Sequence, residues 1–276
     1  PRLGLNAEEH DRLAAEIDTI YHNGAHVDAL FPFEQLRAAN VGGTEELLRL
    51  ATTSWLKPFH FVSTVSVTDL ELSGASTQVS GYVESKWRAE RIVEAAASAG
   101  VPASIYRVPR LTGDSRTGRS NNRDIMFRIL RLILELGVCP DIELSETWIP
   151  VDEAARLIIM ASRRPQERDR FVLMSERQVH LPELLEAIRE VGHEIEVKPF
   201  SEWENELAVR SPEEREIISS IFQDESGADT IDVHEDTHQE VLHKEFTPII
   251  ARGVDERTLR LYVDSLYPHA SHHRTV

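Results

Sequence analysis

The sequence predicts an α/β fold built on a doubly wound parallel sheet, followed by a smaller, mostly helical domain. Residues 17–22, 59–67 and 103–108 are rich in β-branched and aromatic residues and predict buried strands. Helical patterns lie between these strands, and the connections are short. Strands that alternate with helices in this way form βαβ units, in which the strands run parallel.

The first helix signal is Asn6, which can cap a helix whose first turn contains Glu8 and Glu9. A longer helical pattern over residues 33–50 follows the first strand and contains two adjacent glycines, Gly42 and Gly43. A glycine inside a helix costs roughly 1 kcal/mol relative to alanine, so we expect a packing or ligand reason for this pair.

The second strand is expected to lead into a polar loop over residues 68–80 and then into a helix that contains Tyr82. The third strand stops at Pro109. A segment rich in glycine, arginine and serine follows at residues 110–122 and is predicted to be a functional loop.

The pattern over residues 125–136 is strongly apolar and predicts a helix that is buried on most of its circumference. A further helix through Ala161 and a strand at 170–174 complete the first domain, which we place at residues 1–175. The second domain is placed at residues 176–276. Its expected elements are helices at 181–191, 212–222 and 256–266, with an acidic linker at 223–236.

Composition excludes several classes of function. The chain has 276 residues and a formal net charge of -17, which argues against nucleic acid or an anionic membrane as a partner. Its single cysteine, Cys139, excludes an internal disulfide framework and fits a reducing cytoplasm. The sequence contains no signal peptide and no apolar run long enough to span a bilayer.

Tyr82 and Lys86 are four residues apart on a predicted helix, so their side chains share a face. An ammonium beside a phenol favours the phenolate, and we expect Lys86 to lower the pKa of Tyr82. Such a tyrosine can pass a proton to a carbonyl oxygen while hydride is delivered to the carbon. Thr64, at the carboxyl end of the second strand, is expected beside Tyr82, where both hydroxyls can donate to one oxyanion. Taken alone, the pair also fits exposed residues of an amphipathic helix.

Five short motifs follow one another in an order that resembles extended short-chain dehydrogenases/reductases. They are His22–Ala25, Asn40–Thr44, Phe61–Thr64, Tyr82–Lys86 and Tyr106–Pro109. The runs Tyr21–Ala25, Glu34–Val41 and Thr112–Gly118 are, more closely, similar to terminal thioester reductase domains of nonribosomal peptide and polyketide synthetases. Carboxylic acid reductases and aminoadipate reductases contain the same module. The resemblance is strong over residues 1–152 and fainter beyond.

The resemblance implies a Rossmann domain that binds NADPH and reduces a thioester held on the phosphopantetheine of a carrier domain, releasing an aldehyde or alcohol. The helical second domain would then bind substrate and carrier. Catalytic roles are implied for Thr64, Tyr82 and Lys86, which would also contact the cofactor. The other cofactor contacts that the resemblance implies are Asn23, Gly24, Ala25 and Asn40, with Arg107, Val108 and Pro109 passing near the nicotinamide.

The chain departs from this family in lacking the Gly-x-x-Gly-x-x-Gly turn that holds the pyrophosphate at a helix N-terminus. We therefore expect residues 1–175 to be the C-terminal portion of the cofactor-binding domain. The interval from Thr64 to Tyr82 is also short for the family. The residue that would select between NADPH and NADH is not in this chain, so the choice of NADPH is implied by the resemblance alone.

Two alternatives remain open from the sequence. One is an extended reductase that acts on a nucleotide sugar as an epimerase or dehydratase. The other is a cofactor-free module that keeps the fold and only docks a carrier domain.

Two further patterns were weighed for ligand binding. His234–His238 matches the H-E-x-x-H pattern of zinc hydrolases, but its acidic, polar context argues against a metal site, and we assign none. Four loop arginines fit either the phosphate of phosphopantetheine or cofactor, or ordinary solvated charge. They are Arg110, Arg116, Arg119 and Arg123.

Overall fold

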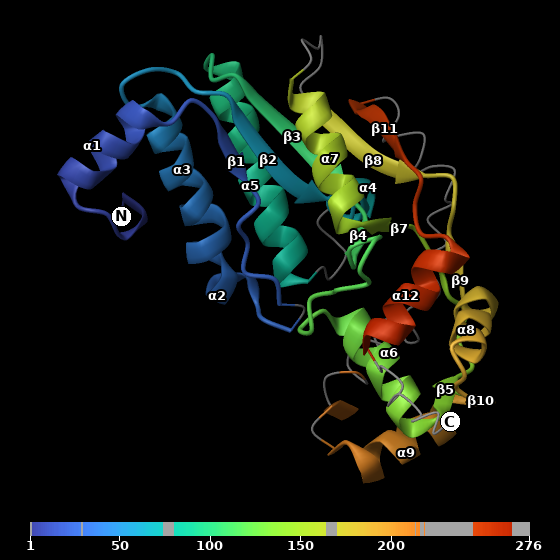
Figure 1. The fold of residues 1–276 in the computed structure, drawn as a ribbon. Coiled ribbons are helices and arrows are strands. Elements are labelled where there is room, and N and C mark those ends of the chain that lie inside the picture. The colour runs from blue at the N-terminus through green and yellow to red at the C-terminus, as the bar shows by residue number, and fades with distance from the viewer. Residues whose placement is uncertain are drawn as a thin grey trace, which may run out of the picture. The chain divides into compact units, whose positions relative to one another are not determined.

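The computed structural model of the chain describes residues 2–28, 30–73, 80–163, 170–212, 214, 215, 218 and 245–266, apart from the side chains of Asp69 and Ser73. The chain divides into two compact units (Figure 1). Unit 1 consists of Pro1–Pro109, Ile158–Met174 and Asp232–Ile249. Unit 2 consists of Arg110–Leu157, Ser175–Ile231 and Ile250–Val276.

Unit 1 is built on a five-stranded sheet of order β1-β2-β3-β8-β11. The strands are β1 (Ile20–His22), β2 (Phe59–Thr64), β3 (Ala103–Val108), β8 (Arg170–Ser175) and β11 (Thr247–Ala251). The pairs β1–β2, β2–β3 and β3–β8 are all parallel. The predicted parallel α/β sheet is therefore confirmed.

The helical elements that precede and separate these strands follow the predicted order. They are η1 (Arg2–Gly4), α1 (Ala7–Glu16), α2 (Phe33–Arg37), η2 (Ala38–Gly42), α3 (Gly43–Thr52), α4 (Val67–Ser73) and α5 (Gly81–Ser98). The predicted cap of α1 is confirmed, because the Asn6 side chain accepts from the Glu9 N–H at 2.9 Å and Glu9 Oε2 accepts from the Asn6 N–H at 3.0 Å.

Two details of the chain before α5 differ from the prediction. The helix expected over residues 33–50 contains a π-helical segment, η2, at its centre, and this segment ends at the first of the two glycines. The prediction of a loop from Thr68 was wrong for the first half of that segment, where the helix α4 forms and Val67 and Thr68 are fully buried. This segment is helical because its side chains pack into unit 1. Residues 74–79, the rest of that loop, lie outside the described residues.

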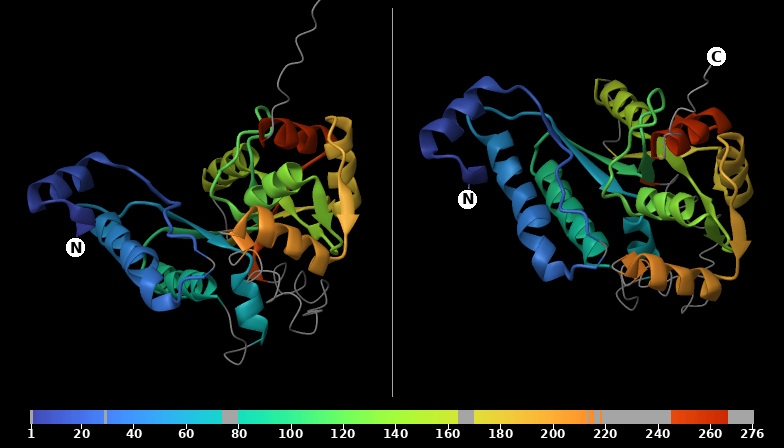
Figure 2. Two further views of the ribbon diagram at one scale, coloured as in Figure 1. Left: turned by 90° about the horizontal axis from the view of Figure 1, so that it is seen from below. Right: turned by 60° about the horizontal axis from the view of Figure 1, so that its bottom comes forward.

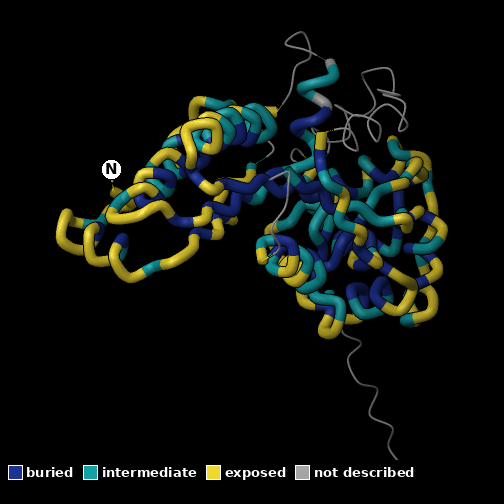
Figure 3. Tube along the Cα trace, turned by 90° about the horizontal axis from the view of Figure 1, so that it is seen from above, coloured by how far each residue is buried: buried dark blue, intermediate teal, exposed yellow. Residues whose placement is uncertain are grey.

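The two faces of the sheet in unit 1 have different chemistry. On one face, Phe59, Phe61 and Ile105 are buried in a core with residues of α3 and α5, two helices that lie side by side (Figures 1 and 2). On the other face, Tyr21 stacks on His60, with 4.7 Å between ring centres. All six residues of β3 and four of the six residues of β2 are buried, and buried residues are dark blue in Figure 3.

Unit 2 is organised around α6 (Ile125–Leu136), which forms over the predicted residues. Seven of its residues are buried in a core with side chains of α8 (Leu181–Glu190), α9 (Phe200–Arg210) and α12 (Glu256–Leu266). α7 (Val151–Ser162) begins in this unit and ends in unit 1. The strands of unit 2 that lie in the described ranges form three two-stranded sheets. They are β4 (Arg110–Thr112) with β7 (Trp148–Pro150), β5 (Val138–Pro140) with β10 (Glu196–Lys198), and β6 (Ser145–Glu146) with β9 (Val179–His180).

The division into units differs from the one placed after residue 175. The chain does pass from unit 1 to unit 2 between Met174 and Ser175, close to the predicted boundary. However, residues 110–157 group with the C-terminal helices. The reason is the apolar circumference of α6, which finds its partners on α8, α9 and α12. The strands of unit 2 and helix α9 were not predicted. Most of the helix expected at 212–222 and all of the acidic segment at 223–236 lie outside the described residues. None of the helices in the described ranges has both the length and the apolar character needed to cross a bilayer.

A glycine at the start of α5 gives a direct test of this packing. A Cβ on Gly81 would lie 2.4 Å from both the Phe31 carbonyl oxygen and the Phe33 nitrogen, which are backbone atoms and cannot rotate away. We expect Gly81→Ala to lower the free energy of unfolding by at least about 1–3 kcal/mol, measured by denaturant titration. Gly43→Ala is the matched control, because nothing lies within 4 Å of its added methyl group, and it should stabilise α3 slightly. Equal stabilities of the two variants would contradict the close contact.

Candidate active site

The amine of Lys86 joins helix α5 to strand β2. Lys86 Nζ donates to the Val62 carbonyl oxygen at 2.6 Å and lies 4.1 Å from the centre of the Phe61 ring. The residue is only 4% exposed. Burial lowers the pKa of Lys86 to about 8, and the negative charge of Glu90 opposes this shift. The amine is therefore held in place and titrates close to neutral pH.

Tyr82 lies in the first turn of α5, which Ser80 caps by accepting a hydrogen bond from the Val83 N–H at 3.3 Å. Burial raises the pKa of the Tyr82 phenol, so the prediction that Lys86 would lower it was wrong for this structure. The Lys86 amine donates to the Val62 carbonyl oxygen, and burial disfavours the charged form of this amine by lowering its pKa. The phenol therefore stays protonated at neutral pH, which is the form that can donate a proton.

Thr64 is the last residue of β2 and is half-buried. Its Oγ1 lies 3.3 Å from both the backbone nitrogen and the hydroxyl of Ser66. The Ser66 N–H donates to Thr64 Oγ1, which leaves the Thr64 hydroxyl hydrogen able to point at Ser66 or at another acceptor. Ser66 was not predicted as part of the site, although its place two residues after Thr64 was visible in the sequence.

Asn23, Gly24 and Ala25 directly follow β1 and are exposed. They leave the sheet at its carboxyl edge, where β2 and β3 also end. The preceding residue, His22, is buried and shares a hydrogen bond with Thr44 Oγ1 at 2.9 Å. Burial, assisted by the positive charge of Lys86, lowers the pKa of His22 to about 4, so this imidazole is neutral at physiological pH.

Asn40 lies in the π-helical segment η2, and π-helical turns are frequent at functional sites. Its side chain accepts from the His26 N–H at 2.7 Å and donates to the His26 carbonyl oxygen at 3.0 Å and to Ser85 Oγ at 2.8 Å. Ser85 in turn donates to the Tyr82 carbonyl oxygen at 2.7 Å. The Asn40 amide is thus occupied in joining the loop after β1 to the turn that contains Tyr82 and Lys86. Ser85 was not predicted as part of the site, although it stands between those two residues in the sequence.

Arg107 lies on β3 and is fully buried, and its guanidinium is hydrogen-bonded to other side chains of unit 1. The guanidinium donates five hydrogen bonds, two to Glu90, two to Glu71 and one to Thr68. An arginine has five N–H donors, so none remains for a cofactor. The Arg107 side chain is therefore not available for the predicted contact with a nicotinamide, which is left to the strand end at Val108 and Pro109.

The structure thus gathers some of the predicted residues at one edge of the sheet. The register pairs Thr64 with Val108, and the Val65 N–H donates to the Val108 carbonyl oxygen at 3.1 Å. In open parallel sheets, ligands bind outside the carboxyl ends of the strands. No hydrogen bond joins Thr64, Tyr82 and Lys86 to one another, although all three lie in the described part of the chain.

The backbone of the loop after β4, in unit 2, packs against α12 at two glycines. The Tyr262 hydroxyl donates to the Gly113 carbonyl oxygen at 2.8 Å, and a Cβ on Gly118 would lie 2.2 Å from the Leu261 carbonyl oxygen. Of the four arginines weighed as phosphate ligands, Arg110 pairs with Glu146 and Arg116 with Asp114, while Arg119 and Arg123 are exposed. The glycines of this loop therefore have a packing role, whereas Arg116, Arg119 and Arg123 remain exposed.

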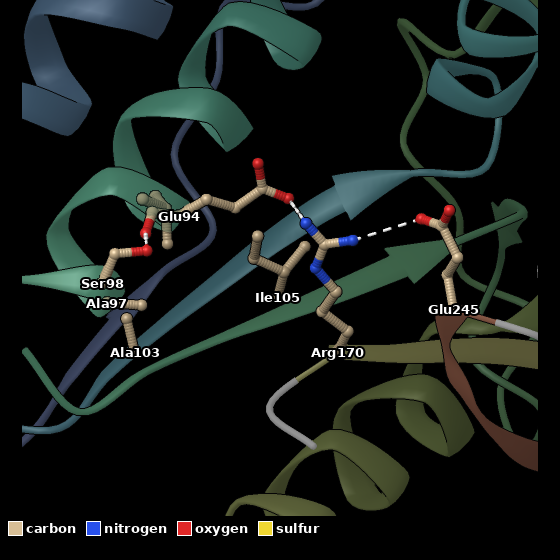
Figure 4. A pocket seen from close by; sticks show the side chains of 8 residues that line it. Glu94, Ala97, Ser98, Ala103, Ile105, Arg170 and Glu245 are labelled. Carbon is tan, nitrogen blue, oxygen red and sulfur yellow. Dashed lines mark hydrogen bonds and ion pairs between the residues drawn. The ribbon is translucent and has the colours of Figure 1, made fainter.

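Unit 1 also contains a cavity of about 280 Å³ that the sequence did not indicate (Figure 4). It is lined by the end of α5 and the first residues of β3 and β8, among them Ser98, Ala103 and Arg170. The Arg170 side chain is paired there with Glu94 and Glu245. The cavity lies at the amino ends of the strands, so it is separate from the sheet edge that contains Thr64.

Comparisons with known proteins place this geometry in context. The family model described as male sterility protein, an NAD-binding domain, matches residues 1–158. A linear gramicidin synthase component of Brevibacillus parabrevis is 41% identical over 217 residues, which cover 74% of this chain and 4% of that protein. The L-2-aminoadipate reductase large subunit of Candida glabrata is 32% identical over 231 residues, 74% of this chain and 17% of that protein. The chain therefore spans a small part of these relatives.

Among solved structures, the terminal R domain from the myxalamid PKS-NRPS biosynthetic pathway superimposes with a TM-score of 0.77 at 35% sequence identity. The match covers 96% of this chain and 72% of that one.

The Asn40 amide supplies a prediction for the stability of the site. Asn40→Ala removes three hydrogen bonds and leaves the His26 N–H and the Ser85 hydroxyl without that partner, so we expect the free energy of unfolding to fall by about 1–3 kcal/mol. Denaturant titration measures the loss. Asn23→Ala is the control, because Asn23 is exposed, and should stay within about 0.5 kcal/mol of the parent. A loss of the same size in both variants would show that the amide network does not hold the site.

Proposed function

Since the chain belongs to the male sterility family of NAD-binding domains, alongside the terminal R domains of peptide and polyketide synthetases, we propose that it is an NADPH-dependent thioester reductase. The observation that supports this most is the placement of Tyr82 and Lys86 one turn apart at the start of α5, with the Lys86 amine fixed on the strand that ends in Thr64.

The donor groups fit the nicotinamide and ribose half of such a cofactor. Lys86 has three N–H donors and uses one on Val62, which leaves two for ribose hydroxyls. Asn23, Gly24 and Ala25 would follow the cofactor along the sheet edge, together with the backbone of Val108 and Pro109. When bound, the nicotinamide would supply hydride to the carbonyl carbon of the substrate.

The chain's own residues would then handle the charge that develops on the carbonyl oxygen. The hydroxyls of Thr64 and Tyr82 donate hydrogen bonds to this oxygen, and Tyr82 transfers its proton to it. The raised pKa of Tyr82 keeps that proton available at neutral pH. Lys86 binds the ribose and so holds the nicotinamide beside Tyr82 and Thr64. The resulting thiohemiacetal collapses, expels the thiol and leaves an aldehyde, and a second round would give an alcohol.

We propose that the substrate is an acyl or peptidyl chain held as a thioester on a phosphopantetheinylated carrier domain in the cytoplasm, with unit 2 contributing to substrate and carrier binding. Support for this comes from the relatives, which include a component of a linear gramicidin synthase and an R domain of a PKS-NRPS pathway. A nucleotide sugar is the competing substrate for a fold of this kind.

Tyr82→Phe removes the proposed proton donor and keeps the ring. We expect the rate of aldehyde formation from a pantetheine thioester with NADPH to fall roughly 10²-fold or more, while NADPH binding measured by fluorescence titration persists. Tyr21→Phe is the matched control, because this hydroxyl bonds to Ser162 on the other side of the sheet, and should keep near-normal turnover. Unchanged aldehyde formation by Tyr82→Phe would refute the assignment. NADPH-dependent turnover of nucleotide sugars in place of thioesters would refute the substrate class.

A further inference from the structure

A buried ion cluster joins three elements of unit 1 behind the proposed site. Arg107 Nη2 lies 2.7 Å from Glu90 Oε2, and Arg107 Nη1 lies 2.8 Å from Glu71 Oε2 and 2.9 Å from Thr68 Oγ1. Arg107 lies on β3, Glu90 on α5, and Glu71 and Thr68 on α4. The Arg107 guanidinium also lies 4.4 Å from the centre of the Phe246 ring. The cluster therefore fixes α5 and α4 to the central strand.

Stability alone does not explain such a cluster. The side chains of Arg107 and Glu90 are 1% and 0% exposed. Removing two charges from water costs about as much as their attraction returns, and well-packed apolar residues often stabilise a protein as well or better. Buried charges with a specific arrangement are instead frequent where a functional group must be held in one charge state. The groups next to the cluster therefore decide its role.

Lys86 precedes Glu90 by four residues on α5, so the two side chains lie one above the other on the same face of the helix. The Lys86 amine is buried against β2, where burial disfavours its charged form. Glu90 supplies the negative charge that opposes this effect. Its carboxylate stays in place because Arg107 holds both of its oxygens.

Other ionisable groups around α5 do not replace Glu90 in this role. The charged or titratable residues described on the elements packed around α5 are Tyr21 and His22 on β1, His60 on β2, Tyr106 and Arg107 on β3, Glu71 on α4, Glu34 and Arg37 on α2, and Glu45, Glu46 and Arg49 on α3. Among these groups and those of α5 itself, Glu90 is the group whose charge raises the pKa of Lys86. The nearby His22 is neutral, because its pKa is lowered to about 4.

We propose that Glu90 keeps the buried Lys86 amine in its charged form and that Arg107 holds the Glu90 carboxylate in position, which makes both of them positioning residues of the reductase site. The inference rests on the proposed function for its effect on turnover, although the charge coupling itself does not. Arg107 also donates to Thr68 and Glu71 and so holds α4, the helix that follows Thr64 and Ser66, against β3.

Glu90→Gln tests the charge coupling directly. The change keeps the shape of the side chain and removes its charge, while Arg107 keeps its bidentate pair with Glu71. The chain has four lysines, Lys57, Lys86, Lys198 and Lys244, so the ¹³Cε signals of lysine-labelled protein can be followed individually against pH, and Lys86→Arg assigns the signal. We expect the Lys86 titration midpoint to fall by about one pH unit, the lower end of the effect of a neighbouring opposite charge.

Glu94→Gln is the matched control. Glu94 lies one turn further along α5 and also forms ion pairs, with Arg91 and Arg170, so this variant loses ion pairs of the same kind away from Lys86. Its Lys86 midpoint should equal that of the parent. If Glu90→Gln fails to fold, Glu90→Met, which also removes the charge and keeps the length of the side chain while Arg107 stays paired with Glu71, takes its place, and the Lys86 midpoint should again fall. An unchanged midpoint, or an equal shift in Glu94→Gln, overturns the inference.

The pH profile of thioester reduction gives the second readout. Activity that needs the charged amine is lost as pH rises through the Lys86 pKa, so a lower pKa moves this loss to lower pH. Above both midpoints, Glu90→Gln should turn over about tenfold more slowly than the parent, and below both midpoints the rates should converge. A merely structural loss would lower the rate equally at every pH. If the parent protein reduces no thioester, the proposed function fails, while the lysine titration still decides the coupling between Glu90 and Lys86.

Discussion

The hydrogen bond from Lys86 to the Val62 carbonyl oxygen is the constraint on which the geometry of the proposed site depends. It fixes the first turns of α5 against β2, two residues before that strand ends in Thr64. A lysine amine that is 4% exposed has to be hydrogen-bonded and charge-balanced, because an unpaired buried ammonium would lose its proton. Val62 and Glu90 together meet these two needs, and the rest of unit 1 holds them in place.

Polar groups in unit 1 accordingly act in pairs that connect neighbouring elements. Asn40 joins the loop after β1 to Ser85 on α5, and Arg107 joins β3 to Glu90 and Glu71. Both side chains are committed to the protein itself, although the family resemblance implied contact with a cofactor. Their part in the proposed reaction is to hold the residues that would touch substrate and cofactor.

Much of the fold could be predicted because its signals are local. The Asn6 cap, the helix at residues 125–136 and the helix at 256–266 follow from capping residues and apolar periodicity. The helix α4, the π-helical segment around Asn40 and the grouping of residues 110–157 with unit 2 depend on contacts between distant segments, which periodicity does not encode. The proposed site residues follow from the spacing of Tyr82 and Lys86, whereas the rise in the Tyr82 pKa could not be predicted from the sequence, since it depends on burial.

The most direct test of the central claim follows hydride itself. NADPH carrying deuterium at C4, prepared separately in each of its two stereochemical forms, is supplied to the whole protein with a pantetheine thioester, and the aldehyde is analysed by mass spectrometry. The account predicts that one of the two forms, and only one, delivers a single deuterium to the former carbonyl carbon, because a fixed site presents one face of the nicotinamide. An aldehyde without deuterium from either form, or no aldehyde at all, would contradict it.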